Sequence, residues 1–280
     1  MFKYRFLLFA AALMLVLPGQ SPAQDTKRAI TQIAGDLYRF QNNFHFSVFL
    51  VTPEGVIATD PINAEAAEWL KAEIKSRFNQ PVRYVVYSHD HGDHISGGEV
   101  FKKDGATIIA HAVAKSDIAA GNVPTATPDI TYTDHMTLTL GGKTVELMFL
   151  GKSHSDNMTV MHFPEEKTVF TVDFISVKRL PFRVIRDSYW PDLADTIDKV
   201  TALEFDILAP GHGALGGKQD AMDHAQYLRD LESAVKAGID SGKTLDQMKA
   251  EIKMEKYADW GQYDAWLGEN IQGMHRLLTQ

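Results

Sequence analysis

Cysteine is absent from the 280-residue chain. Its absence excludes disulfide bridges and every zinc site built on thiolates, zinc fingers included. It also excludes a lipid anchor attached through a cysteine. Any metal site in this protein must therefore be built from histidine and carboxylate side chains.

Positive charge is scarce as well. The chain has 28 Lys and Arg residues against 36 Asp and Glu residues, which gives a formal net charge of -8. Nucleic-acid binding requires a basic surface, so we expect no nucleic-acid partner. Internal repeats and Ser/Gly-rich or Pro-rich linkers are also lacking, which favours one compact domain.

Long apolar runs are confined to the N-terminus. Lys3 and Arg5 precede an unbroken apolar segment, residues 6–17, which Pro18 and Gly19 interrupt before the small residues of Ser21-Pro22-Ala23. This three-part pattern predicts a secretory signal peptide over residues 1–23. The alternative is an uncleaved anchor, but the segment is shorter than the ~20 residues that cross a bilayer.

Cleavage after this peptide would place the protein in the periplasm or outside the cell, without stable membrane association. Residues 24–280 would form a single domain, with a core at about 35–215 and a helical C-terminal part at 216–280. Loss of two basic residues would change the formal charge from -8 to about -10. Oligomeric state leaves no mark in the sequence.

Hydrophobic periodicity predicts mixed strands and helices. Helices are expected at 63–78, from about 113, at 192–203 and from 218 onward. Strands are expected at 37–40, 47–52, 55–60, 82–87, 107–110, 137–140, 144–150, 157–163, 168–173 and 206–208. Two halves of this kind suggest two sheets packed face to face, with helices outside.

The strongest chemical signal is the segment Ser88-His89-Asp90-His91-Gly92-Asp93-His94, directly after an apolar strand. A strand could not bury so many polar groups without a cost of several kcal/mol. We therefore expect a loop in which these side chains converge, with Gly92 permitting a sharp turn. Neutral imidazole and carboxylate are good ligands for zinc and similar divalent ions.

This segment resembles the His-x-His-x-Asp-His motif of the metallo-β-lactamase superfamily. Three later residues, each expected at a strand end, are similar to the remaining motifs of that family: His154 within Gly151-Lys152-Ser153-His154, Asp173 within Thr171-Val172-Asp173, and His212 within Pro210-Gly211-His212. The resemblance spans roughly residues 37–213. It implies an αββα sandwich of the α/β (α+β) class, with C-terminal helices.

The resemblance also implies a dinuclear zinc site, with iron or manganese as other divalent candidates. His89, His91 and His154 would hold the first ion. Asp93, His94 and His212 would hold the second, and Asp173 would bridge both. Asp93 would also orient the attacking hydroxide or accept a proton.

The implied activity is hydrolysis of a small-molecule ester, thioester, lactone or amide, β-lactams included, by a metal-bound hydroxide. The bridging Asp173 is similar to that of glyoxalase-II-like thioesterases and lactonases, whereas some zinc β-lactamases have Cys or Ser there. Phosphoester or organophosphate hydrolysis, a mononuclear-iron oxidoreductase and a non-catalytic periplasmic metal-binding protein remain as alternatives.

Three further residues are weaker candidates. Asp60, at an expected strand end, would orient metal ligands, although a turn-forming Asp before a proline competes with this interpretation. His45, in an aromatic hairpin tip, would belong to a flap over the substrate. Lys178, in a cluster with Arg179 and Arg183, would bind a substrate carboxylate, but a solvated surface explains such a cluster equally well.

Overall fold

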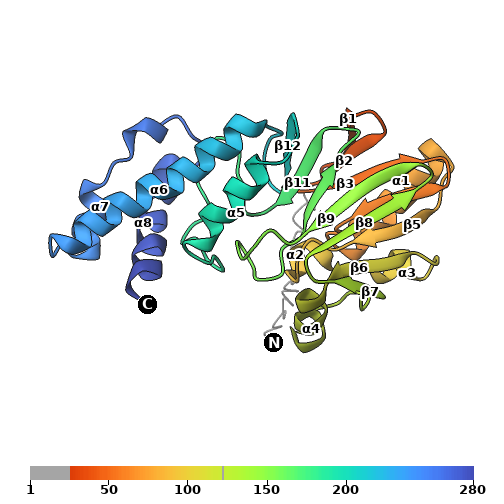
Figure 1. The fold of residues 1–280 in the computed structure, drawn as a ribbon, viewed down its shortest axis with the longest axis horizontal. Coiled ribbons are helices and arrows are strands. Elements are labelled where there is room, and N and C mark those ends of the chain that lie inside the picture. Colours follow the sequence, from red (N-terminus) through yellow and green to blue (C-terminus); the bar gives the residue numbers. More distant parts are fainter. Residues whose placement is uncertain (1–25, 122) are drawn as a thin grey trace, which may run out of the picture.

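The computed structural model describes residues 26–121 and 123–280. The expected signal peptide at residues 1–23 lies outside this part of the chain. Within it, the backbone forms two β-sheets packed against each other and helices on their outer faces (Figure 1). This is the αββα arrangement that the order of strands and helices predicts.

The first sheet has seven strands in chain order. Neighbours from β1 to β4 are antiparallel, and those from β4 to β7 are parallel. The strands are β1 (Arg28–Ala34), β2 (Leu37–Asn42), β3 (His45–Thr52), β4 (Gly55–Thr59), β5 (Val82–Val86), β6 (Thr107–His111) and β7 (Ile130–Tyr132).

The second sheet has five strands in the order β12-β11-β10-β9-β8. Only the pair of β11 and β12 is parallel. The strands are β8 (His135–Leu140), β9 (Lys143–Met148), β10 (Val160–Phe163), β11 (Thr168–Val172) and β12 (Ile207–Pro210). Because β4, β5, β11 and β12 belong to parallel pairs, the loops that follow them leave the sandwich at common edges.

Two apolar clusters hold the layers together. One lies between the sheets and includes Leu50, Val86 and Phe170, all fully buried. The other lies beneath the outer helices, where Leu70 and Ile74 of helix α1 pack against the first sheet. The helices of this part are α1 (Ala64–Phe78), α2 (Gly92–Ile95), α3 (Glu99–Lys102), α4 (Ala112–Gly121) and α5 (Asp192–Thr201).

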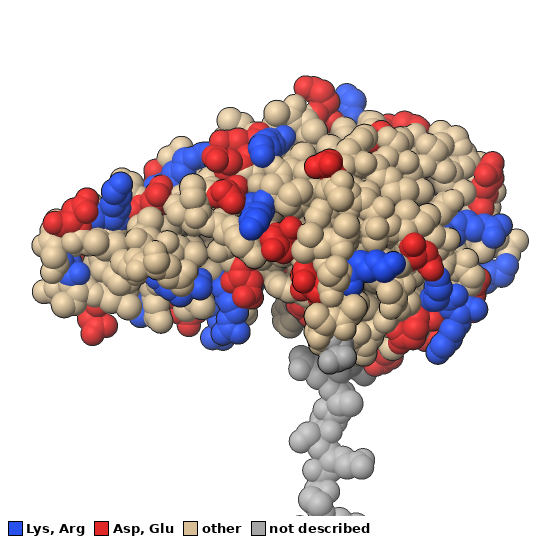
Figure 2. Space-filling model, turned by 60° about the horizontal axis from the view of Figure 1, so that its bottom comes forward, with Lys and Arg blue, Asp and Glu red and all other residues tan. Residues whose placement is uncertain are grey.

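The C-terminal part is helical, as expected, and projects from one side of the sandwich (Figure 1). It consists of α6 (Lys218–Asp240), α7 (Leu245–Glu251), the 3-10 turn η1 (Glu255–Tyr257) and α8 (Tyr263–Thr279). Within the described residues, none of these or the other helices has the length and apolarity that a membrane crossing requires. On the face drawn in Figure 2, acidic and basic side chains are interspersed over this projection.

The structure differs from the sequence interpretation in several places, which include the unexpected short helices α2 and α3. Strands β1 and β7 were not expected, because β1 alternates weakly and β7 has only three residues. Residues 157–159 lie outside β10 and form part of a polar loop. The chain turns at Gly92 into the short helix α2, but the turn does not require glycine, because φ of Gly92 is not positive and an added Cβ would meet no atom closer than 3.5 Å.

Candidate metal centre

The histidine-rich segment follows β5 and enters helix α2. His89 and His94 are fully buried, and His91 precedes the first residue of the helix. The amides of His94 and Ile95 both donate to the His91 carbonyl, which closes the first helical turn. Asp93 and His94 are therefore adjacent on a helical turn, and their side chains reach the same region, with Asp93 Oδ2 3.9 Å from His94 Nε2.

The other ligand candidates follow strands of the second sheet. His154 lies in the loop after β9, Asp173 is the residue after β11, and His212 is the second residue after β12. Gly211 lets the loop after β12 lie close to Asp173 and His94, because an added Cβ would be 2.9 Å from Asp173 Oδ1 and 3.1 Å from His94 Cε1. Both sheets thus direct their strand ends to one place.

Two groups of candidate ligand atoms result. In the first, His89, His91 and His154 bring their ring nitrogens within 4.8 Å of one another, and His154 Nε2 lies 3.1 Å from His91 Nδ1. In the second, His94 Nε2 is 3.0 Å from Asp173 Oδ2, and His212 Nε2 is 3.3 Å from Asp173 Oδ1. His154 Nε2 also lies 3.7 Å from Asp173 Oδ2, so this carboxylate stands between the groups.

Asp93 lies beside the second group, but the histidine nearest to its carboxylate is His45 and not His94. Its Oδ2 is 3.9 Å from His94 Nε2 but 3.3 Å from His45 Nε2. His45, Asp93 and His212 form a third group of mutually close ligand atoms. The hairpin residue His45 therefore lies next to the other candidate ligands. The sequence placed it in a flap over the substrate and did not predict its contact with Asp93.

The donor atoms suit divalent cations. Ligands around a tetrahedral ion with bonds of about 2.0–2.2 Å are separated by about 3.3–3.6 Å, and the contacts of 3.0, 3.3 and 3.7 Å to Asp173 lie around this spacing. Among the described residues, His89 Nε2, His94 Nε2 and Asp173 Oδ1 are buried without a hydrogen-bond partner. Buried polar atoms without partners are rare, and an ion bound at each of the two groups would satisfy all three.

The electrostatics match this interpretation. Burial, together with the neighbouring His94, holds the pKa of His89 well below its ordinary value, so this imidazole is neutral and has a lone pair to donate. Burial also lowers the pKa values of His154 and His212. Burial would raise the pKa of Asp173, but His94 and His212 overcome this effect and hold it well below its ordinary value.

Hydrogen bonds from the surroundings fix the ligand side chains. Asp60 is fully buried; its Oδ1 accepts from the Ser88 amide at 2.8 Å and its Oδ2 lies 3.5 Å from His94 Nδ1. Ser88 Oγ lies 2.8 Å from His89 Nδ1. Sequence reasoning missed Ser88, although its position next to the first histidine was visible. His212 Nδ1 donates to the Phe44 carbonyl at 2.8 Å, which leaves Nε2 free to bind a cation.

The basic cluster after Asp173 consists of Lys178, Arg179 and Arg183, whose side chains have different surroundings. The Lys178 side chain is exposed and makes no hydrogen bond or ion pair with any other residue of the described chain. The Arg179 guanidinium lies 4.6 Å from the centre of the Trp266 ring, and Arg183 contacts Phe182 in the same way at 5.5 Å. Arg179 and Arg183 thus pack against aromatic rings, whereas Lys178 extends into solvent.

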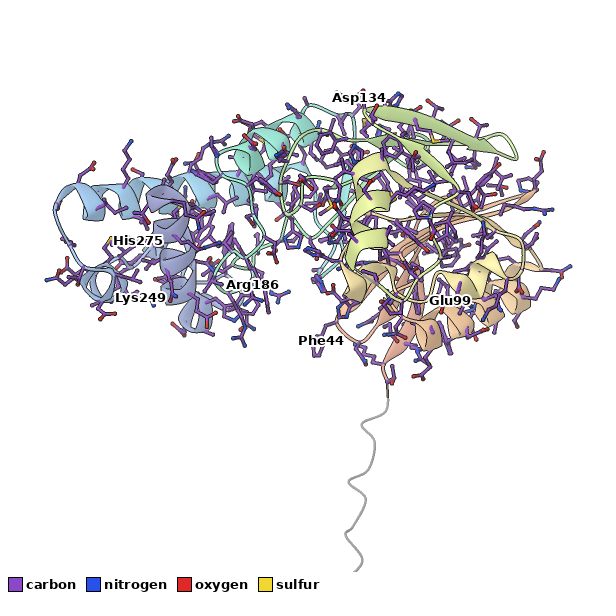
Figure 3. All side chains as sticks on the ribbon, turned by 90° about the horizontal axis from the view of Figure 1, so that it is seen from below. Phe44, Glu99, Asp134, Arg186, Lys249 and His275 are labelled. Carbon is purple, nitrogen blue, oxygen red and sulfur yellow. The ribbon has the colours of Figure 1, made fainter. Side chains whose placement is uncertain are left out.

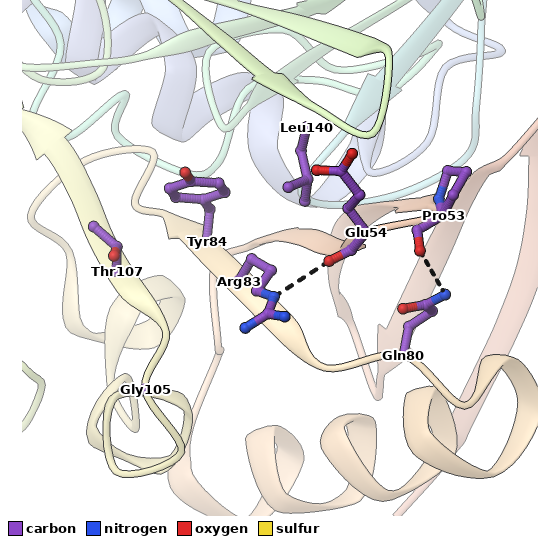
Figure 4. A pocket seen from close by; sticks show the side chains of 8 residues that line it. All are labelled: Pro53, Glu54, Gln80, Arg83, Tyr84, Gly105, Thr107 and Leu140. Carbon is purple, nitrogen blue, oxygen red and sulfur yellow. Dashed lines mark hydrogen bonds between the residues drawn. The ribbon is translucent and has the colours of Figure 1, made fainter.

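A separate depression of about 600 Å³ lies far from this centre (Figure 4). It is at the opposite end of β5, where Arg83 Nε donates to the Glu54 carbonyl and Gln80 donates to the Pro53 carbonyl, both at 3.2 Å. None of its eight lining residues is a histidine. It therefore offers no set of ligands comparable to the metal centre.

Residues 43–212, more than half of the chain, match the sequence profile of the Metallo-beta-lactamase superfamily. The chain belongs to this superfamily. Membership makes it a metal-dependent hydrolase and removes the alternative of a non-catalytic metal-binding protein. The matched region contains every ligand candidate from His45 to His212, whereas helices α6–α8 lie beyond it.

The chain is 23% identical to the 2,4-dinitroanisole O-demethylase subunit alpha of Nocardioides sp. over 253 residues, covering 87% of this chain and 73% of that protein. It is 29% identical to the type 2 metallo-beta-lactamase of Elizabethkingia meningoseptica over 124 residues, covering 44% and 49%. It is 21% identical to the linear primary-alkylsulfatase of Pseudomonas sp. over 257 residues, covering 72% and 48%. The chain thus spans about half the length of the last two relatives.

Solved structures support the fold. The metallo-beta-lactamase from Pontibacter korlensis superposes with a TM-score of 0.64 at 22% identity, covering 71% of this chain and 99% of that one. Metallo-beta-lactamase IND-7 gives a TM-score of 0.63 at 22% identity, covering 72% and 100%. The αββα sandwich predicted from the sequence is therefore confirmed.

Proposed function

We propose that this protein is an exported dinuclear zinc hydrolase that cleaves an ester, thioester, lactone or amide bond of a small molecule. The position of Asp173 supports two ions, because its carboxylate lies within 3.7 Å of histidines from both ligand groups. A mononuclear site would leave one of the two groups of ligand atoms without a cation.

Bound divalent cations would supply Lewis acidity and lower the pKa of a water molecule. The protein side chains set the charge and geometry around them. His89, His91 and His154 offer only imidazole nitrogens, whereas the second group includes a carboxylate. Three protein ligands at the first position leave room for solvent or substrate, which is the arrangement of catalytic rather than structural zinc sites.

Besides metal ligation, Asp93 could orient the attacking hydroxide or accept a proton, and its pKa favours the first of these two roles. A hydrogen bond from His45 lowers the pKa of the Asp93 carboxyl to about 2, so this group is ionised throughout the neutral range. A carboxylate of such low basicity is a poor proton acceptor at neutral pH. Asp93 therefore suits ligation and orientation of the nucleophile better than proton transfer.

Metal analysis combined with a substrate panel tests this proposal. We expect two equivalents of zinc per chain, turnover of at least one carbonyl ester, thioester, lactone or β-lactam substrate, and loss of activity on chelation that added zinc restores. Iron or manganese in place of zinc would revise the metal assignment. Activity that survives complete removal of metal would reject the proposal.

Hydrolysis of an oxoacid ester, such as a phosphoester, is the second candidate. Its specific support is the alignment with an alkylsulfatase over 72% of this chain. Phenyl phosphate, phosphotriester and alkyl sulfate substrates belong in the same panel. A kcat/KM for any of these that exceeds the values for all carbonyl substrates would favour this candidate over the first.

Export is proposed from the N-terminal pattern alone. The basic start, the apolar segment 6–17 and the small residues at 21–23 support cleavage before Gln24. Intact mass and N-terminal sequencing of the protein from a periplasmic fraction test this point. Recovery of the full-length chain in the membrane fraction would favour the uncleaved anchor instead.

A further inference from the structure

The tip of the β2–β3 hairpin contributes a histidine to the metal centre. Strands β2 and β3 pair up to Asn42 and His45, so Asn43 and Phe44 form the turn. Phe44 is exposed and lies at the junction between the sandwich and the helical projection (Figure 3). His45 points the other way, and its Nε2 lies 3.3 Å from Asp93 Oδ2.

The position of His45 is fixed by contacts between the hairpin and the loop that carries His212. The Phe46 amide donates to the Gly211 carbonyl at 2.8 Å, and His212 Nδ1 donates to the Phe44 carbonyl at 2.8 Å. These two bonds flank His45 on both sides. The rings of His45 and His212 consequently meet edge to face, with centroids 4.7 Å apart.

A buried arginine reinforces this junction. Arg39, on β2, donates to the carbonyls of Pro210 and Gly213 at 2.8 and 2.9 Å, on either side of His212. Its guanidinium also lies 3.7 Å from the centre of the Phe46 ring. One side chain therefore contacts both the His212 loop and the hairpin and links them.

We propose that His45 is a further ligand of the second cation, together with Asp93 and His212. The inference rests on the proposed dinuclear function. Ligand atoms of these three residues lie within 4.8 Å of one another, and the contact of 3.3 Å between His45 and Asp93 fits the spacing of two ligands on one ion. His212 belongs to this group and to the group with His94 and Asp173, so one cation next to His212 can be reached from both.

This ligand set makes the two metal positions unequal. The second would have up to five protein ligands, and the first has three together with the shared Asp173. Open coordination for substrate then belongs to the first cation. The hairpin tip would be anchored by metal ligation, so occupancy of the second position and the placement of the tip would be coupled.

The test is a titration of metal-free protein with Zn²⁺ against a chromophoric chelator, with Co²⁺ absorption spectra as a second readout. We expect His45→Ala to weaken Zn²⁺ binding at the second position at least about 10-fold and to change the Co²⁺ bands of that position only, because it removes a ligand. His275→Ala on α8 is the control for loss of a histidine away from the centre and should leave both sites unchanged.

His45→Gln separates ligation from a hydrogen-bonding role. The glutamine amide can donate to Asp93 but is a poor ligand for zinc, so we expect it to behave like His45→Ala. Wild-type affinity and spectra in His45→Gln would overturn the inference. Tighter binding in His45→Ala would also overturn it, since His45 would then compete with the cation for Asp93. Wild-type protein that binds fewer than two ions would instead contradict the proposed function itself.

Discussion

At the scale of single residues, Asp173 shows how a side chain without a local motif acquires a role. It follows a fully buried strand and lies among three histidines from separate loops. Those neighbours, and not its own sequence context, hold its pKa below the ordinary value despite burial. Each of these ligands depends on the others for its protonation state.

Removal of one neutral ligand should empty the first position. His91→Ala is expected to abolish measurable activity and to reduce zinc below two equivalents, because His91 and His154 face each other 3.1 Å apart. Metal analysis and kcat/KM measure both effects. His162→Ala is a matched control, since His162 donates to the Glu204 carbonyl away from the centre. Full activity with stoichiometric zinc in His91→Ala would reject its assignment as a ligand.

A second histidine, outside the metal centre, should make stability depend on pH. Burial lowers the pKa of His224, on α6, to about 4. The unfolded chain, with a pKa near 6.5, therefore binds more protons than the folded protein between pH 4 and 6.5. The stabilising contribution is fully present above pH 6.5 and decreases as pH falls through this window, by about 3 kcal/mol at most.

Denaturant unfolding of metal-free wild type and His224→Phe at pH 7.5 and pH 5 measures this contribution. The free energy of unfolding should fall more between the two pH values in wild type than in the variant. The metal ligands titrate in both proteins, so their effect cancels in the difference. Equal pH dependence of the two proteins would show that His224 is not held neutral.

At the scale of elements, the ends of the strands fix where the loops begin, and the loops carry the residues of the metal centre. The candidate ligands follow β5, β9, β11 and β12, and the hairpin between β2 and β3 brings His45 beside them. Helix α8 has a comparable role for the segment after Asp173, since Asn270 donates to the Pro181 and Arg183 carbonyls at 2.9 and 2.6 Å. That segment is therefore positioned by the C-terminal helices, outside the region matched by the family.

Two glycines of α8 provide a test of the packing of this helix against the segment after Asp173. An added Cβ at Gly273 would lie 2.1 Å from the Val184 carbonyl oxygen, whereas at Gly268 it would meet nothing within 4 Å. Gly273→Ala should lower the free energy of unfolding by more than about 1 kcal/mol because backbone must shift. Gly268→Ala should raise it by about 0.5–1 kcal/mol through helix propensity. Thermal unfolding of both variants measures the contrast, and equal effects would contradict the packing of α8.

At the scale of the whole molecule, the centre connects the two sheets. Its ligands extend from β3 in the first sheet to the loop after β12 in the second. Cations that bind only where these segments meet should therefore stabilise the folded chain as a unit.

Removal of metal should lower the thermal midpoint of unfolding. Free zinc at 100 times its dissociation constant stabilises a single-site protein by about 2.7 kcal/mol. We expect the midpoint to rise continuously with added zinc in wild type and less in His91→Ala. Calorimetry of chelated and reloaded protein checks this, and a midpoint independent of zinc would show that no metal binds preferentially to the folded state.

The sequence determined most of the architecture and singled out the candidate ligands. Apolar periodicity predicted α1, β5 and the helical C-terminal part, because burial repeats with the period of each element. The dense segment 89–94 marked a metal site by itself, since few other roles suit three histidines and two aspartates in six residues. Single residues such as Asp173 and His212 were assigned only through family resemblance and motif order.

Tertiary structure alone decided the contacts across the two sheets. His45 faces Asp93 because the hairpin tip is bonded to the loop after β12, and Arg39 lies under that loop from a distant strand. No local pattern encodes such contacts, because they depend on the packing of elements that are far apart in the chain. For the same reason Lys178 pointed to solvent while its neighbour Arg179 packed on Trp266. A chain specifies which side chains can bind metal, and the packing of its sheets specifies which of them meet.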